Sequence, residues 1–248
     1  MGSFRERYDR MKDKAGEDWW SIVFGYPVGR LLLCGLADIP WITPMGITWF
    51  GFVMKLVAAV FLAVDGLPAR EAVAVTALLL TALADAMDGT LARYRGTTSS
   101  RGAFVDKVSD ALGFYLLMVG LAFNGFERTG DAVLLILGPA AGAGYLTICY
   151  AYWLYRYALK SAARAPAAPA TPEPPPKRRG FWAVQVRILY LCEGDFYFWI
   201  ALAVVLDVPE YAIWMLGTLV PLKAVLRFVQ RLIQVGALDR APQQEKLN

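Results

Sequence analysis

Histidine is absent from the sequence. This absence excludes Ser-His-Asp triads, Cys-His pairs, HExxH metalloprotease sites and His-ligated iron or copper centres. The three cysteines, Cys34, Cys149 and Cys192, lie far apart and form no CxxC pair, so neither a disulfide framework nor a structural zinc site is expected. Any chemistry performed by this chain must therefore rely on carboxylates, hydroxyls, lysine, arginine and a bound ion.

Charged residues are also scarce. They make up 19% of the 248 residues, whereas hydrophobic residues make up 57%; soluble proteins average about 25% charged and about 45–50% apolar residues. The apolar residues form long uninterrupted runs, and no separate soluble domain is visible. The composition therefore predicts an integral membrane protein.

Six apolar segments are long enough to cross a bilayer, which takes about 20 helical residues. They are residues 44–66, 70–94, 104–126, 131–157, 183–206 and 209–235. Before them, residues 18–37 combine aromatic residues and leucines with Pro27 and Arg30, which is typical of an interfacial helix; an imperfect transmembrane helix is the alternative. We predict an all-α integral membrane fold with six transmembrane helices preceded by an N-terminal interfacial amphipathic helix.

Lysine and arginine predict the orientation of the chain. They are concentrated in the N-terminal tail, in the loops at 93–101 and 156–179, and in the C-terminal tail. Because cytoplasmic loops carry an excess of these residues, both termini are predicted to be cytoplasmic, in a bacterial or archaeal cytoplasmic membrane. The predicted divisions are a cytoplasmic tail at 1–16, a single membrane-embedded catalytic domain at 17–236 with a Pro/Ala-rich cytoplasmic linker at 161–180, and a disordered cytoplasmic tail at 237–248.

Four aspartates lie in or beside the second and third predicted spans. Asp85 and Asp88 share one helical face, as do Asp106 and Asp110. The loop between them is short, so the two helices should form a hairpin that presents four carboxylates to one another. An oxygen-only set of this kind suits Mg²⁺, Mn²⁺ or Ca²⁺.

A charged hairpin at the membrane surface is the alternative interpretation of these aspartates. Each charge near the middle of a bilayer costs at least ~2.5 kcal/mol. Salt bridges to Arg93, Arg95 and Lys107 would then offset part of the cost without any metal.

Residues 85–110 read D-x2-D-G-x2-A-R-x8-G-x3-D-x3-D, which resembles the signature of the CDP-alcohol phosphotransferase (CDP-alcohol phosphatidyltransferase) family at every specified position. The predicted helix layout is also similar to that family. The resemblance implies an enzyme of phospholipid synthesis in which a hydroxyl attacks the β-phosphate of a CDP-linked alcohol and expels CMP. It further implies that Asp85, Asp88 and Asp106 bind metal, and that Asp110 is the catalytic base and also touches a metal, with two Mg²⁺ or Mn²⁺ ions per site.

Nucleotide and phosphate contacts are expected from the rest of the signature and from the start of the first span. The residues concerned are Gly89, Ala92, Arg93, Gly102 and Thr48. Arg93 can form forked contacts to phosphate. The stretch WITPMGIT at 41–48 resembles the family's P-N-x-x-T element, with Met45 in the place of Asn. The alternative for this stretch is a helix that begins at Pro44 and is capped by Thr43.

Acceptor contacts are expected from two further groups. Glu193 and Asp195 precede an aromatic-rich span, where they could bind a polyol or, with Tyr197 and Trp199, a choline-like cation; a plain interfacial aromatic belt is the alternative. A phosphorylated acceptor would be anchored by basic residues, which otherwise serve only to orient the chain. These basic residues are Arg156, Arg187, Lys223 and Arg227.

Small residues in the segment GPAAGAG at 138–144 allow close helix approach, either within the fold or in a homodimer, which we expect. We favour CDP-diacylglycerol as donor and a small polar alcohol or polyol phosphate as acceptor; membrane lipid is a partner and nucleic acid is not. Transfer of a choline- or ethanolamine-type headgroup from its CDP derivative to diacylglycerol is the alternative within the family. A divalent-cation transporter is the alternative of another class, because acidic residues within spans also mark ion paths.

Overall fold

The computed structural model describes residues 4–11, 19–163 and 193–240, and these residues form helices and no strand. In chain order the elements are α1 (Phe4–Arg10), the π-helical turn η1 (Ser21–Gly25), α2 (Tyr26–Leu36), α3 (Pro44–Ala63), α4 (Arg70–Arg95), α5 (Ser100–Thr129), α6 (Leu134–Ala163), α8 (Glu193–Val205) and α9 (Pro209–Arg240). The prediction of an all-α fold is confirmed.

Five of these helices, α3, α4, α5, α6 and α9, are long and apolar enough to cross a membrane. They coincide with five of the six predicted spans. The remaining predicted span, 183–206, is described only from residue 193, as the 13-residue helix α8. Residues 183–192, most of the predicted 161–180 linker and the end of the C-terminal tail lie outside the described residues, so the count of six spans stays a prediction.

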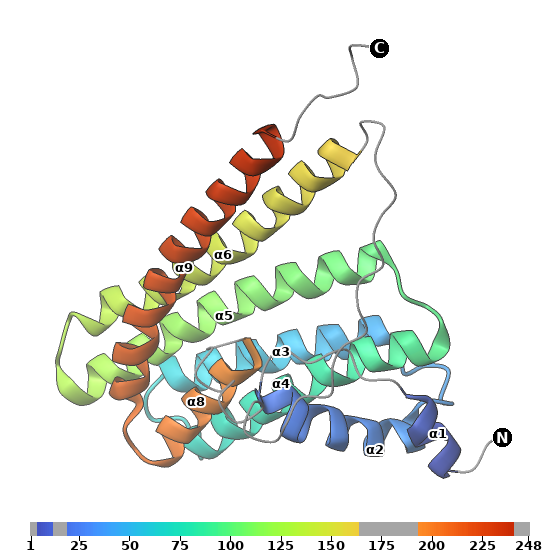
Figure 1. Cartoon of the computed structure of the whole chain (residues 1–248). Coiled ribbons are helices and arrows are strands. Elements are labelled where there is room, and N and C mark those ends of the chain that lie inside the picture. The colour runs from blue at the N-terminus through green and yellow to red at the C-terminus, as the bar shows by residue number, and fades with distance from the viewer. Residues whose placement is uncertain (1–3, 12–18, 164–192, 241–248) are drawn as a thin grey trace.

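The central part of the bundle is formed by α3, α4 and α5, of which α3 packs against both α4 and α5 (Figure 1). Thr43 caps α3, because its Oγ1 accepts from the Gly46 N–H at 3.0 Å and Pro44 occupies the first turn. Gly96 ends α4 with a left-handed φ of 66°, a conformation that glycine adopts without strain. These caps fix where the helices begin and end, and they place the start of α3, the end of α4 and the start of α5 at one end of the bundle.

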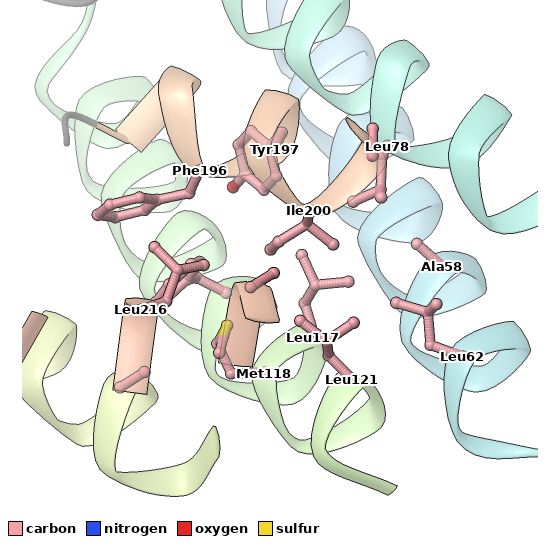
Figure 2. Close-up of a cluster of buried hydrophobic side chains, with 14 of the residues drawn as sticks. Ala58, Leu62, Leu78, Leu117, Met118, Leu121, Phe196, Tyr197, Ile200 and Leu216 are labelled. Atoms are coloured by element: carbon pink, nitrogen blue, oxygen red, sulfur yellow. The ribbon is translucent and has the colours of Figure 1, made fainter. Parts of the chain in front are cut away.

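The core lies between α8 and the long helices. Figure 2 shows Ile200 of α8 pointing toward Leu117 of α5, in the same buried cluster as Phe196 and Tyr197 of α8 and Leu216 of α9. These side chains are buried within the protein rather than exposed on its outer surface. The aromatic residues after Glu193 therefore pack α8 into the bundle.

Glycines bring the outer helices close to α5 and to each other. A Cβ on Gly138 or Gly142 of α6 would collide with Met118 or Tyr115 of α5, and one on Gly144 would lie 3.0 Å from Pro221 of α9. The small-residue face at 138–144 is therefore used in internal packing. The homodimer stays a prediction that no longer draws support from this motif.

The first helices lie against the end of α4 that carries the aspartates. Met11 and Leu33 are fully buried in a cluster with Met87 and Leu91. Arg7 strengthens the contact between α1 and α2 by donating to the Cys34 carbonyl at 3.0 Å. Part of the predicted tail at 1–16 is thus a helix docked on the domain, while the interfacial position of residues 18–37 stays a prediction.

Candidate functional site

A small open cleft lies between α3, α4 and α5. Its polar lining residues are Thr48, Lys55, Thr81, Asp85, Asp88, Asp106 and Asp110. The cleft therefore contains all four aspartates of the signature.

Three carboxylates converge in the cleft. One oxygen atom from each of Asp85, Asp106 and Asp110 lies within 4.8 Å of the others. Asp110 is only 3% exposed, so its charge is shielded from water and requires cationic neighbours. An all-oxygen group of this size fits Mg²⁺ or Mn²⁺.

Asp88 is held on one side of the same cleft. The Thr48 hydroxyl donates to Asp88 Oδ2 at 2.6 Å, and the Gly89 N–H donates to Asp88 Oδ1. Thr48 thus has a partner inside the site, where sequence reasoning expected it to contact nucleotide. This bond ties the beginning of α3 to the end of α4.

Two lysines contact the fourth carboxylate. Lys55 Nζ lies 2.5 Å from Asp110 Oδ1, and Lys107 Nζ lies 3.0 Å from Asp110 Oδ2 and 3.2 Å from Asp106 Oδ2. The Lys55 side chain is 4% exposed and that of Lys107 is 36% exposed. One ammonium group is therefore enclosed by the protein, and the other is accessible from outside.

Lys55 and Thr81 are the polar cleft residues that sequence reasoning missed, and Lys55 is the charged one. Lys55 lies within the apolar segment 44–66 and was counted as part of the predicted span. It is the single charged residue of that segment before Asp65. A lysine in the middle of a spanning helix is costly unless it faces a partner, and this cost is the signal that would have identified it. Its partner, Asp110, is 55 positions away in the sequence.

Two of the arginines in the signature region, Arg93 and Arg95, have different roles. Arg93 is exposed and donates to Thr90 Oγ1 at 3.1 Å, and a Cβ on Gly89 would lie 3.1 Å from its Nη1. Arg95 donates to backbone carbonyls of Ala37, Ile39 and Ile42 at 2.6–3.0 Å. Arg95 therefore secures the connection between α2 and α3, whereas Lys107 pairs with Asp106 and Asp110.

Gly102 and Ala92 flank the hairpin loop. The Gly102 N–H donates to Ser99 Oγ at 3.0 Å, which caps the first turn of α5. The Ala92 carbonyl accepts from the Thr97 N–H at 2.9 Å, which closes the last turn of α4. Both residues thus take part in the hydrogen bonds that end α4 and begin α5.

The predicted acceptor residues that the structure describes are not among those that line the cleft. Asp195 is fully buried and accepts from the backbone N–H of Trp20 at 3.1 Å. Arg156 and Arg227 are exposed on α6 and α9, and Lys223 is half-buried on α9; none of these four lines the cleft described above. Arg187 and the side chain of Glu193 lie outside the described residues.

Comparison with known proteins agrees with this site. Residues 41–208 match the model of a family described as CDP-alcohol phosphatidyltransferase. The inner membrane protein YnjF of Escherichia coli (strain K12) is 34% identical over 114 residues, which are 46% of this chain and 53% of that protein. The archaetidylinositol phosphate synthase of Pyrococcus horikoshii is 32% identical over 97 residues, which are 39% of this chain and 50% of that protein.

The chain spans about half the length of the curated relatives it matches. The family match is longer, and it extends from the residues just before α3 to the connection between α8 and α9. It therefore includes the whole of the carboxylate cleft. The chain belongs to the CDP-alcohol phosphatidyltransferase family, a family of transferases.

Proposed function

We propose that this protein transfers a substituted phosphoryl group from a CDP-alcohol to the hydroxyl of a small polar alcohol or polyol phosphate, releasing CMP. CDP-diacylglycerol is the favoured donor, which places the reaction in phospholipid synthesis. The observation that carries the proposal is the convergence of Asp85, Asp106 and Asp110 in one cleft of a membrane bundle. The family match supports it by covering that cleft.

The site is proposed to hold Mg²⁺ or Mn²⁺, two ions in the complex with nucleotide, bound by Asp85, Asp88, Asp106 and Asp110. Such ions supply the positive charge that lets an anionic pyrophosphate approach carboxylates and that stabilises the leaving CMP. The donor set is made only of oxygen atoms, which is the preference of hard divalent cations. Asp88 is already oriented by Thr48.

In the proposed reaction the acceptor oxygen forms a bond to the β-phosphorus, and the bond from that phosphorus to the bridging oxygen of CMP breaks. Asp110 takes the proton of the acceptor hydroxyl. Both oxygens of Asp110 accept from ammonium groups, so one oxygen must be vacated first. Lys107 is the more exposed partner and is the group that leaves.

Nucleotide recognition is assigned to the mouth of the cleft. The exposed guanidinium of Arg93 lies beside Gly89, where it can form charge-assisted bonds to phosphate. The absence of a side chain at Gly89 leaves room for this guanidinium against the end of α4. Ala92 and Gly102 are proposed to contribute contacts from the adjoining turns, where their backbone groups form capping hydrogen bonds.

A polyol phosphate is proposed as acceptor. The name of the Pyrococcus horikoshii relative, archaetidylinositol phosphate synthase, supports this class. Arg156, Lys223 and Arg227 are the proposed anchors for the acceptor phosphate, because α6 and α9 end on the same side as α4 (Figure 1). We assign this side to the cytoplasm, since it carries the basic residues that favour a cytoplasmic location.

The test uses purified protein in lipid nanodiscs with CDP-diacylglycerol or a CDP-linked headgroup as donor and a panel of alcohols and polyol phosphates as acceptors. CMP release and the lipid product are measured by mass spectrometry, with Mg²⁺, Mn²⁺ or EDTA, and with Asp110→Asn as the inactive control. We expect metal-dependent CMP release with CDP-diacylglycerol. CMP release only with a headgroup donor and diacylglycerol would reverse the substrate assignment.

The same purified protein can be used to distinguish a transferase from a divalent-cation transporter. An enzyme of this kind is stabilised against heat by CDP or CMP together with Mg²⁺, whereas a carrier responds to the metal alone. Stabilisation by metal alone, together with no CMP release from any donor, would overturn the proposed function.

A further inference from the structure

Lys55 is placed deep in the protein, 11 residues after the first residue of α3. At 1.5 Å per residue this is roughly 16 Å along the helix, near the middle of a segment that is apolar enough to span a membrane. A charged group at this depth must be retained by a specific interaction. Its ion pair with Asp110 is that interaction.

Residues of two other helices leave space for the Lys55 side chain and contact it. Gly113 lies one turn beyond Asp110 on α5, and a Cβ at Gly113 would lie 2.5 Å from Lys55 Cδ and 3.2 Å from its Cβ. On another side, Lys55 Nζ lies 5.6 Å from the centre of the Tyr197 ring, a distance at which an aromatic face attracts a cation. Three helices thus hold the ammonium group against Asp110 Oδ1.

Lys107 makes the opposite kind of contact with the same carboxylate. Its side chain is nine times more exposed than that of Lys55, 36% against 4%. It contacts Oδ2 of both Asp106 and Asp110, so its ammonium group lies where a cation would bridge these two carboxylates. An exposed lysine can swing away, whereas the enclosed Lys55 cannot.

The charge balance of the cleft follows from these contacts. With all four carboxylates ionised, the ammonium groups of Lys55 and Lys107 leave a net charge of −2. When Lys107 swings out the net charge becomes −3, and Asp110 still keeps one oxygen bound to Lys55. One divalent cation compensates most of this charge, and a second would exceed it before the anionic nucleotide arrives.

We propose that Lys55 is a positioning residue that acts as a permanent internal cation of the site. Lys55 keeps Asp110 Oδ1 bound, so that only Oδ2 of Asp110 can exchange Lys107 for a metal ion or for the acceptor hydroxyl. Its fixed positive charge also limits the nucleotide-free site to one tightly bound divalent cation. This proposal rests on the proposed function in one respect, namely that the four aspartates bind metal. It goes beyond that function by assigning a role to a residue outside the aspartate signature.

The test measures Mn²⁺ binding to the full-length protein without nucleotide, by titration calorimetry and by electron paramagnetic resonance of free Mn²⁺. We expect one tight Mn²⁺ per wild-type chain. Removing the fixed charge in Lys55→Gln should tighten Mn²⁺ binding by about tenfold or more, because a charge within a few ångströms of a cation is weakly screened in a buried site, or should create a second tight site. Lys160→Gln, which removes an exposed charge on α6, should bind as wild type does.

Gly113→Ala gives an independent variant that retains the lysine. The added methyl group would displace Lys55 from Asp110, so it should also tighten Mn²⁺ binding. If Lys55→Gln does not fold, Mn²⁺ binding to Gly113→Ala tests the proposal in its place. Mn²⁺ binding that is unchanged or weaker in the folded variants would overturn the proposal, because a purely structural lysine would leave or lower the affinity.

Turnover distinguishes this proposal from the proposed function. Tighter Mn²⁺ binding in Lys55→Gln without CMP release from wild type would support the role of Lys55 and reject the transferase reaction. CMP release by wild type with unchanged Mn²⁺ binding in the variants would support the reaction and reject the role of Lys55.

Discussion

The Thr48 hydroxyl lies 2.6 Å from Oδ2 of Asp88, a residue 40 positions further along the chain. This hydrogen bond joins the first turns of α3 to the signature-bearing end of α4. Asp88 is 8% exposed, so few water molecules can replace Thr48 as a donor. The orientation of Asp88 therefore depends on a residue outside the aspartate hairpin.

Thr48→Val should lower kcat/KM for CMP release while preserving the fold. A hydrogen bond to a charged group contributes about 2 kcal/mol, so a reduction of up to roughly 30-fold is expected. Steady-state assays over a range of Mg²⁺ concentrations provide the measurement. Thr218→Val is the matched control, because the Thr218 hydroxyl only donates to carbonyls of its own helix; equal losses in both variants would rule out a specific role for Thr48.

Asp106→Asn should abolish the stabilisation that CDP and Mg²⁺ confer together. A ligand at 100 times its Kd raises the free energy of unfolding by about 2.7 kcal/mol, and the variant should lose this gain because it lacks one of the converging carboxylates. Thermal unfolding with and without EDTA measures the effect. Glu71→Gln, an exposed change at the opposite end of α4, should keep the full stabilisation, and a persistent gain in Asp106→Asn would contradict the metal assignment.

The sequence was sufficient to predict five of the six expected spans and the helical faces that carry the aspartates, because both follow from local regularities. Apolar length identifies a span, and three- or four-residue spacing puts aspartates on one helical face. The helix ends were less predictable: α4 runs to Arg95 and α5 starts at Ser100. Gly96 and Ser99 stop and start these helices, so the polar residues near the loop remain helical.

The contacts that complete the site could not be predicted because they join distant parts of the chain. Lys55 pairs with Asp110 across 55 residues, and Asp195 accepts from Trp20 across 175. No spacing rule covers such pairs, since they depend on how the helices pack. The same holds for the glycines at 138–144, for which the sequence left both internal packing and dimerisation open.

Gly120→Ala should destabilise the contact between α3 and α5. A Cβ at this position would overlap the backbone carbonyl of Ala59, and overpacking of this kind costs about 2 kcal/mol. Gly35→Ala is the control, because nothing lies within 4 Å of its added Cβ and alanine favours the helix. Melting temperatures should fall for Gly120→Ala and stay level or rise for Gly35→Ala; equal values would contradict the close packing of these helices.

Arg95→Lys should loosen the connection between α2 and α3. The guanidinium binds three carbonyls at once, those of Ala37, Ile39 and Ile42, and an ammonium group cannot match this forked geometry. We expect a loss of about 2 kcal/mol in stability and faster proteolysis between residues 37 and 43. Arg101→Lys is an exposed, charge-preserving change at the start of α5, and this variant should be cleaved by the protease at the wild-type rate.

Asp195→Ala tests whether this buried carboxylate is structural or binds the acceptor. Its Oδ1 accepts from the Trp20 N–H and its side chain is fully enclosed, so it caps the start of the helical segment that leads through η1 into α2. Loss of such a cap costs about 1 kcal/mol, and the melting temperature should fall while the KM for the acceptor stays constant. A raised acceptor KM at an unchanged melting temperature would instead assign Asp195 to the acceptor, which would require α8 to move before the acceptor binds.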